Sequence, residues 1–202
     1  EFGFGGCLAD DMGLGKTVQI PAFLDARRQR RQLARKKPAK AGDAAPSLVV
    51  VPRSLVFNWL QEAARFAPKL RMFNYTGSER GAGLDRLNEY DLVVTTYGTL
   101  RHDIKLLCAL DFDYVILDEA QAIKNASSQS AKACRLIKSR RRLAMTGTPV
   151  ENHLGELWSL FEFLTPGMLG RNRKLNDLLA ANRQARLVES GNSKVAPPSE
   201  EL

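Results

Sequence analysis

Short apolar segments alternate with longer amphipathic segments along the chain, and this alternation is what most restricts its fold. Five apolar segments are predicted to be strands, with residues 72–75 as a sixth candidate; the five are residues 6–9, 48–51, 92–95, 114–117 and 142–146. Segments with helical spacing separate them, at residues 16–30, 55–66, 99–110, 128–138 and 154–164. Two strands are almost wholly apolar, which is typical of parallel strands buried on both faces. The chain is therefore predicted to be an α/β protein with three α/β/α layers and a mainly parallel central sheet.

The predicted elements divide the 202 residues into one domain and a tail. Residues 1–170 carry all the predicted strands, and we interpret them as a single domain. Inside it, residues 31–46 are rich in basic residues, Ala and Pro and are predicted to be a flexible linker. Residues 171–202 are predicted to form a basic helix followed by a disordered tail.

Composition excludes several classes of protein. The chain is 44% hydrophobic and 26% charged, close to ordinary globular proteins, which excludes wholesale disorder and a collagen-like structure. No apolar segment approaches the roughly 20 residues that a membrane span needs, and the start shows no export signal. Three widely spaced cysteines, Cys7, Cys108 and Cys134, favour small core residues in a reducing, intracellular compartment over disulfides or a zinc site. The isolated His102 and His153 are interpreted as structural or surface residues.

The net charge of +8 is concentrated in one segment. Of the 30 basic residues, eight lie between Arg27 and Lys40 without an acidic residue among them, and the other 22 equal the 22 acidic residues. Because charge runs are usually solvated, we interpret this segment as a helix end leading into the linker. Contact with nucleic acid is the alternative.

A glycine-rich segment follows the first predicted strand and opens the first predicted helix: Asp10-Asp11-Met12-Gly13-Leu14-Gly15-Lys16-Thr17. At such a turn, backbone N–H groups and the helix N-terminus bind phosphate, the lysine reaches the outer phosphates, and the threonine hydroxyl ligates magnesium. The general phosphate-loop pattern has Gly where this chain has Asp10. By itself, the segment is therefore also compatible with a glycine-rich helix start that carries a solvated lysine.

Two further polar segments follow predicted strands. Asp118-Glu119-Ala120-Gln121 comes after residues 114–117, where an Asp can hold magnesium and a Glu can orient and deprotonate water. Acids at strand ends also cap helices, but two motifs in the right order on the right elements favour a nucleotide site. Thr146-Gly147-Thr148 follows the last predicted strand and places hydroxyls near the same edge of the sheet.

Taken together, these segments closely resemble motifs I, II and III of the SWI/SNF-type ATPases of helicase superfamily two, which carry an acid at the position of Asp10. Residues 49–55, with Asn58 and Trp59, resemble motif Ia, and residues 94–100 resemble a later DNA-contacting motif. Residues 156–164 resemble the helix after motif III. The resemblance covers roughly residues 5–170.

The resemblance implies a RecA-like fold and a motor that binds ATP and Mg²⁺ between two RecA-like lobes. It implies that Lys16, Asp118 and Glu119 are catalytic and that Thr17 and Asp118 ligate the metal. The implied cofactor-binding residues are Asp10, Asp11, Met12, Gly13, Leu14, Gly15, Lys16, Thr17 and Gln121. Gln121, Thr146, Gly147 and Thr148 would couple the nucleotide state to lobe closure.

The resemblance also implies that double-stranded DNA is the partner, contacted through its backbone and independently of sequence. Pro52, Arg53 and Ser54 place a cation and a hydroxyl at a helix N-terminus, which suits a DNA phosphate. Thr95, Thr96 and Tyr97 are expected to act likewise. A DNA-bound protein that is remodelled would be a further partner, translocation along the duplex is expected rather than strand separation, and no membrane partner is expected. The expected location is intracellular, either cytoplasmic or nucleoid-associated, or nuclear in a eukaryote.

Two departures from the family pattern qualify the activity. The upstream glutamine motif that recognises adenine is not among these residues, and nothing after Gly170 resembles the second lobe, which supplies arginines that stabilise the transferring phosphoryl group. We therefore expect this chain alone to bind nucleotide weakly without turnover. The alternative function is a catalytically incomplete nucleotide- or DNA-binding module.

Overall fold

The computed structural model describes residues 5–10, 15–34, 45–147 and 154–169 of the chain. Glu1–Met168 form one compact unit and Leu169–Leu202 a second, of which only Leu169 is described. All helices and strands described belong to the first unit. None of the described helices is long and apolar enough to cross a membrane.

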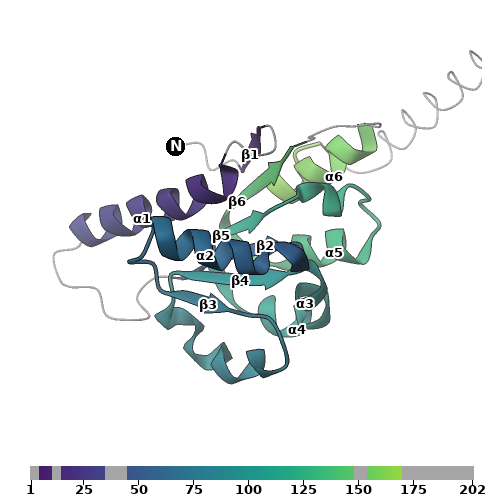
Figure 1. The fold of residues 1–202 in the computed structure, drawn as a ribbon. Coiled ribbons are helices and arrows are strands. Elements are labelled where there is room, and N and C mark those ends of the chain that lie inside the picture. The colour runs from purple at the N-terminus through teal and green to yellow at the C-terminus, as the bar shows by residue number, and fades with distance from the viewer. Residues whose placement is uncertain (1–4, 11–14, 35–44, 148–153, 170–202) are drawn as a thin grey trace, which may run out of the picture. The chain divides into compact units, whose positions relative to one another are not determined.

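In the described part of the chain, six strands form one parallel sheet with the order β1-β6-β5-β2-β4-β3 (Figure 1). The strands are β1 Gly6–Ala9, β2 Ser47–Val51, β3 Met72–Asn74, β4 Leu92–Thr96, β5 Asp111–Leu117 and β6 Lys138–Thr146. The predicted α/β class with a mainly parallel sheet is confirmed. The sixth candidate strand is present as β3 at an edge of the sheet.

Helices connect the strands. They are α1 Lys16–Ala34, α2 Val56–Phe66, α3 Tyr97–His102, α4 Ile104–Leu107, α5 Gln129–Leu136 and α6 Leu154–Leu164, with 3-10 helices η1 Arg53–Leu55, η2 Glu79–Glu89 and η3 Ala120–Ile123. The helix predicted for residues 99–110 is divided into α3 and α4 at Asp103. The backbone of Asp103 leaves the helical conformation, with φ −103° and ψ 19°.

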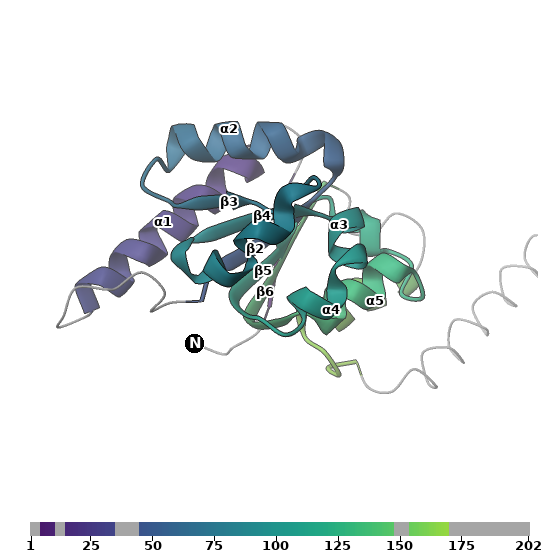
Figure 2. The same cartoon turned by 90° about the horizontal axis from the view of Figure 1, so that it is seen from below.

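Two layers of helices enclose the sheet, with α1 and α2 on one face and α3, α4, α5 and α6 on the other (Figure 2). Successive side chains of β2 point to opposite faces, so Val49 packs in one apolar cluster with Trp59 of α2, and Leu48 packs in the other with Phe163 of α6. Burial on both faces explains why β2 and β5 are nearly continuous apolar segments. Cys134 is buried as predicted, whereas Cys7 is exposed because β1 lies at the other edge of the sheet.

Helix α1 continues to Ala34, four residues into the segment 31–46 predicted to be a linker. Its basic side chains have a buried partner: Arg27 donates to both carboxylate oxygens of Asp113 on β5, at 2.7 and 3.0 Å, and Arg31 also pairs with that carboxylate. The Asp113 side chain is only 1% exposed. The start of the basic segment therefore anchors α1 to the sheet, whereas residues 35–44 lie outside the described residues.

The two arginines also determine the charge state of Asp113. Burial alone would raise the pKa of this carboxyl, but the hydrogen bonds and charges of Arg27 and Arg31 outweigh burial and lower it. Asp113 is therefore ionised in the folded protein, and its ion pair contributes to the free energy of unfolding.

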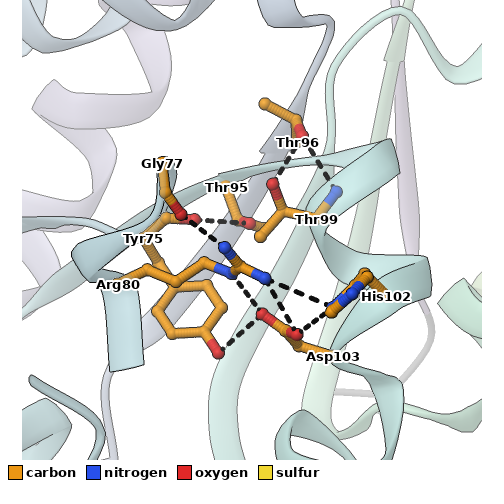
Figure 3. Close-up of polar contacts among 8 residues, drawn as sticks. All are labelled: Tyr75, Gly77, Arg80, Thr95, Thr96, Thr99, His102 and Asp103. Carbon is orange, nitrogen blue, oxygen red and sulfur yellow. Dashed lines mark hydrogen bonds and ion pairs between the residues drawn. The ribbon is translucent and has the colours of Figure 1, made fainter. Parts of the chain in front are cut away.

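A second carboxylate, Asp103 at the end of α3, contacts Tyr75, which follows β3, and Arg80 of η2 (Figure 3). The Tyr75 hydroxyl donates to Asp103 Oδ2 at 3.1 Å, the Arg80 guanidinium donates to both carboxylate oxygens, and His102 Nδ1 lies 2.6 Å from Oδ1. Arg80, followed by His102 and Tyr75, holds the pKa of Asp103 well below its usual range against the opposing effect of burial. Burial and the neighbouring carboxylate raise the pKa of Tyr75 to about 12. These long-range contacts explain why the predicted helix breaks at Asp103.

The Asp113 ion pair gives a first prediction. Replacing Asp113 by Asn leaves two arginines against a neutral amide, and because the arginines are partly exposed we expect a loss of about 2 kcal/mol in the free energy of unfolding. Urea unfolding followed by circular dichroism would measure it. Glu89→Gln is the control, since its ion pair with Arg86 is exposed on both sides and its loss should be undetectable. Equal effects of both variants would contradict the prediction.

The lowered pKa values of Asp103 and Asp113 predict a loss of stability in acid. In the unfolded chain, the pKa of an Asp is about 3.9. As the pH falls, the two carboxylates are therefore protonated in the unfolded state before they are protonated in the folded state, and this lowers the free energy of the unfolded state relative to the folded state. The stabilisation is complete above about pH 5 and is lost as the pH falls through about 4 toward the lower folded-state pKa values. Urea midpoints measured from pH 7 to pH 3 should fall accordingly. Asp103→Asn should have a lower midpoint at pH 7 and a shallower decline, and a decline as steep as that of the wild type would refute this role.

Candidate functional site

The residues predicted to bind a nucleotide follow strands that end side by side (Figure 1). Ala9 of β1 is opposite Thr146 of β6, and Leu117 of β5 is opposite Ala144 of β6. Because the strands are parallel, their carboxyl ends lie at one edge of the sheet. This edge brings the segments that contain Lys16, Asp118 and Thr146 together.

The glycine-rich segment is described at both of its ends. Gly15 has φ +74°, in the left-handed region that favours glycine, and α1 begins at the next residue, Lys16. The Lys16 ammonium donates to the backbone carbonyl of Asp10, so it folds back over the segment. The N-terminus of α1, with its partial positive charge, lies at the same place. The predicted nucleotide contacts Asp11, Met12, Gly13 and Leu14 lie outside the described residues.

Asp118 lies at the end of β5 and is 5% exposed. Its Oδ2 accepts a hydrogen bond from the indole Nε1 of Trp59 at 2.7 Å, and its Oδ1 accepts one from the backbone N–H of Glu119 at 2.9 Å. Its backbone carbonyl accepts from the Tyr97 hydroxyl at 2.7 Å. Asp118 is therefore fixed by side chains from two other segments.

Burial raises the pKa of Asp118 above its usual value, and the charge of Glu119 raises it further. The Trp59 hydrogen bond, and to a smaller extent the positive charge of Lys16, oppose this rise. Burial disfavours the ionised form of a carboxylate, and a cation bound next to it stabilises that form. Asp118 therefore has the properties of a cation ligand.

Glu119 follows with a left-handed backbone, φ 48° and ψ 57°, which is rare for a residue other than glycine. Gln121 Nε2 donates to Glu119 Oε2 at 2.6 Å, and the Thr146 hydroxyl donates to Gln121 Oε1 at 3.2 Å. A line of hydrogen bonds thus runs from the end of β6 to the predicted general base. The predicted coupling residues Gln121 and Thr146 are brought together, Gly147 directly follows β6, and Thr148 lies outside the described residues.

The donor set fits magnesium that is held jointly with a nucleotide. Among the described residues, no group of three or more His, Cys, Asp or Glu side chains could hold a metal by themselves. Mg²⁺ is commonly bound through one or two carboxylates together with substrate phosphates and water. Asp118 would be such a carboxylate, and Thr17, the second residue of α1, carries the hydroxyl that the sequence predicts as a further ligand.

The predicted DNA-contacting residues 52–54 lie at the carboxyl end of β2. Pro52 precedes η1, which runs directly into α2, and both Arg53 and Ser54 are exposed. An exposed cation and hydroxyl at the start of a helical segment are suited to a phosphate group.

The side chains of the second predicted DNA-contacting segment, residues 95–97, make contacts within the protein. Thr95 is fully buried, and its hydroxyl donates to the Tyr75 carbonyl at 3.0 Å, so its side chain is not available to DNA (Figure 3). The Thr96 hydroxyl caps α3 by accepting from the Thr99 N–H at 3.1 Å. The Tyr97 hydroxyl is directed to Asp118. These three side chains therefore have partners within the protein.

Trp59 and Tyr97 are the site residues whose contacts the sequence analysis missed. Trp59 is a core residue, with 0% exposure. The available signal was chemical: a buried indole N–H or phenol hydroxyl needs an acceptor, and a strand-end carboxylate is a strong one.

Comparison with known proteins gives one consistent result. A model of the SNF2-related domain matches residues 2–194. The chain is 42% identical over 177 residues to an uncharacterised ATP-dependent helicase of Mycoplasma pneumoniae, covering 86% of this chain and 16% of that protein. It is 41% identical over 174 residues to the putative ATP-dependent helicase/translocase YwqA of Bacillus subtilis, with 84% and 18% covered. The TATA-binding protein-associated factor mot1 of Schizosaccharomyces pombe is 38% identical over 188 residues, with 90% and 10% covered.

Among solved structures, the Sulfolobus solfataricus SWI2/SNF2 ATPase core in complex with double-stranded DNA matches with a TM-score of 0.72 and 41% identity. The match covers 84% of this chain and 33% of that one. The core domain from the same organism, in a second structure, matches with a TM-score of 0.67 and 42% identity. The chain thus spans a third of the matched core and between 10% and 18% of the length of the three relatives above.

Proposed function

The chain belongs to the SNF2-related domain family, and we propose that it is the first, nucleotide-binding lobe of a motor that hydrolyses ATP while moving along duplex DNA. The observation that carries the proposal is the cluster at the carboxyl edge of the sheet. There the segments that carry Lys16 and the buried Asp118 follow the two strands on either side of β6, and a hydrogen-bonded line runs from Thr146 through Gln121 to Glu119.

In the proposed mechanism, different side chains bind phosphate, bind the metal and accept the proton of water. Lys16 and the N-terminus of α1 attract the ATP phosphates. Thr17 and Asp118 would hold Mg²⁺, which would neutralise charge on those phosphates. Gln121 orients the Glu119 carboxylate, which accepts the proton of the attacking water. Thr146 donates to Gln121, so a movement at the end of β6 would change the orientation of the general base.

Duplex DNA is the proposed partner, contacted without regard to sequence. The exposed Arg53 and Ser54, at the start of a helical segment, support a contact to the phosphate backbone. The matched Sulfolobus core, whose structure contains double-stranded DNA, supports the same partner class. Two further parts of the proposal are that the parent protein remodels a DNA-bound protein and that it is intracellular: cytoplasmic or nucleoid-associated, or nuclear in a eukaryote.

We also propose that this 202-residue chain, assayed alone, hydrolyses ATP little or not at all. The support is that it spans only a third of the matched ATPase core. The second candidate function, a nucleotide- or DNA-binding module without turnover, describes the isolated chain under this proposal.

Lys16→Ala tests the nucleotide site. The loss of the ammonium should weaken Mg-ATP binding, measured by calorimetry, at least tenfold. Glu119→Gln should retain binding, because the amide keeps the shape of a side chain that acts on water rather than on phosphate. The matched control is Lys138→Ala at the amino end of β6, which should bind as the wild type does.

If Lys16→Ala binds Mg-ATP with unchanged affinity, the assignment of the nucleotide site is wrong. ATP hydrolysis by the isolated chain that survives purification and disappears in Lys16→Ala would instead overturn only the proposal that the chain lacks turnover.

Arg53→Ala tests the DNA contact. We expect a several-fold weaker affinity for duplexes of any sequence and a decrease of about 1 in the slope of log affinity against log salt, since one phosphate contact is lost. Fluorescence anisotropy with two unrelated duplexes at several salt concentrations would measure both quantities. Arg140→Ala, an exposed arginine in the amino-terminal half of β6, is the control. The assignment fails if the two variants lose affinity equally.

A further inference from the structure

We propose that Trp59 and Tyr97 are positioning residues that hold Asp118 from two different helices and so couple DNA contact at Arg53, just before α2, to nucleotide binding. The inference rests on the proposed function and goes beyond it by naming the bonds through which the two ligands influence each other. Each bond ends on a different atom group of the same residue: the carboxylate for Trp59 and the backbone carbonyl for Tyr97.

The Trp59 bond connects the carboxylate to α2. The indole is fully buried, and its Nε1 lies 2.7 Å from Asp118 Oδ2, the distance of a strong charge-assisted hydrogen bond. Trp59 lies in the first turns of α2, which η1 joins without a break to the exposed Arg53. The segment from Arg53 to Trp59 is continuously helical, and this helical connection is the path by which a phosphate bound at Arg53 would act on the indole under the proposal.

The Tyr97 bond connects the backbone of Asp118 to α3. Tyr97 is the first residue of α3, and its hydroxyl donates to the Asp118 carbonyl at 2.7 Å. That carbonyl belongs to the peptide unit that leads into Glu119, whose left-handed backbone needs support from its surroundings. A rotation of α3 would therefore change the backbone position of Glu119, the proposed general base.

Both bonds also satisfy buried polar groups, so a purely structural role must be separated from coupling. Trp59→Phe keeps an aromatic ring and removes the indole donor, and Tyr97→Phe removes only a hydroxyl. If the bonds served stability alone, both variants would lower the urea midpoint and leave the influence of DNA on nucleotide affinity intact. Coupling predicts that this influence is lost.

The experiment measures the affinity of the 202-residue chain for a fluorescent Mg-ATP analogue without duplex DNA and with saturating duplex DNA. The ratio of the two dissociation constants is the coupling factor, which by linkage equals the effect of nucleotide on DNA affinity. We expect about fivefold or more in the wild type and a factor near 1 in each Phe variant. Trp158→Phe and Tyr90→Phe, which change the same chemical groups away from Asp118, should keep the wild-type factor.

A second measurement leaves Trp59 unchanged. The chain has two tryptophans, so in Trp158→Phe the fluorescence comes from Trp59 alone. We expect its emission to change when Mg-nucleotide binds and again when duplex DNA binds. This readout holds even if Trp59→Phe fails to fold.

The outcomes separate the inference from the proposed function. Coupling that persists in both Phe variants, a wild-type factor of 1, or an emission from Trp59 that neither ligand changes although both bind would each overturn the inference and leave the proposed function in place. A wild-type chain that is folded and binds no nucleotide would overturn both.

Discussion

The hydrogen bonds and burial around Asp118 are the interaction on which the site depends. Parallel strands bring the ends of β1, β6 and β5 to one edge, but that alone would leave a carboxylate free to rotate. Trp59 and the backbone N–H of Glu119 each donate a hydrogen bond to one carboxylate oxygen of Asp118, and the Tyr97 hydroxyl donates to its backbone carbonyl. These bonds fix the orientation of Asp118. Lys16 and the line from Thr146 to Glu119 are then arranged around a fixed point. The position of the carboxylate is thus set before any ligand arrives.

A buried carboxylate lies near each end of strand β5, and the pKa values of the two carboxylates are shifted in opposite directions. Asp113, near the amino end, has two arginines beside it, and they lower its pKa. Asp118 immediately follows the carboxyl end, and burial raises its pKa because its neighbours supply less positive charge. The first carboxylate contributes stability to the folded chain at neutral pH. The second one is stabilised when a cation binds, which adds binding energy at the site where a metal is proposed.

The fold class, the order of the elements and the family could be predicted from the sequence, because apolar strands alternate with helices and the motifs follow strand ends in order. The fold match and the family model confirm those predictions. What could not be predicted depends on partners distant in sequence. The break at Asp103 requires Arg80 and Tyr75, and the extension of α1 past Arg30 requires Asp113. Thr95 lies in the predicted DNA-contacting segment, but it is buried in the sheet. Its hydroxyl donates to a backbone carbonyl in the loop after β3.

The left-handed backbone of Glu119 has a consequence for comparing related sequences. A non-glycine residue in that conformation costs about 1–2 kcal/mol, so glycine or asparagine at this position would make the strand end more stable. Stability alone therefore disfavours glutamate here, and under the proposed mechanism its carboxylate, as the general base, is what keeps it at this position. Under the same mechanism, a relative that carries Gly or Asn here while retaining the lysine and aspartate equivalents would bind nucleotide without hydrolysing it.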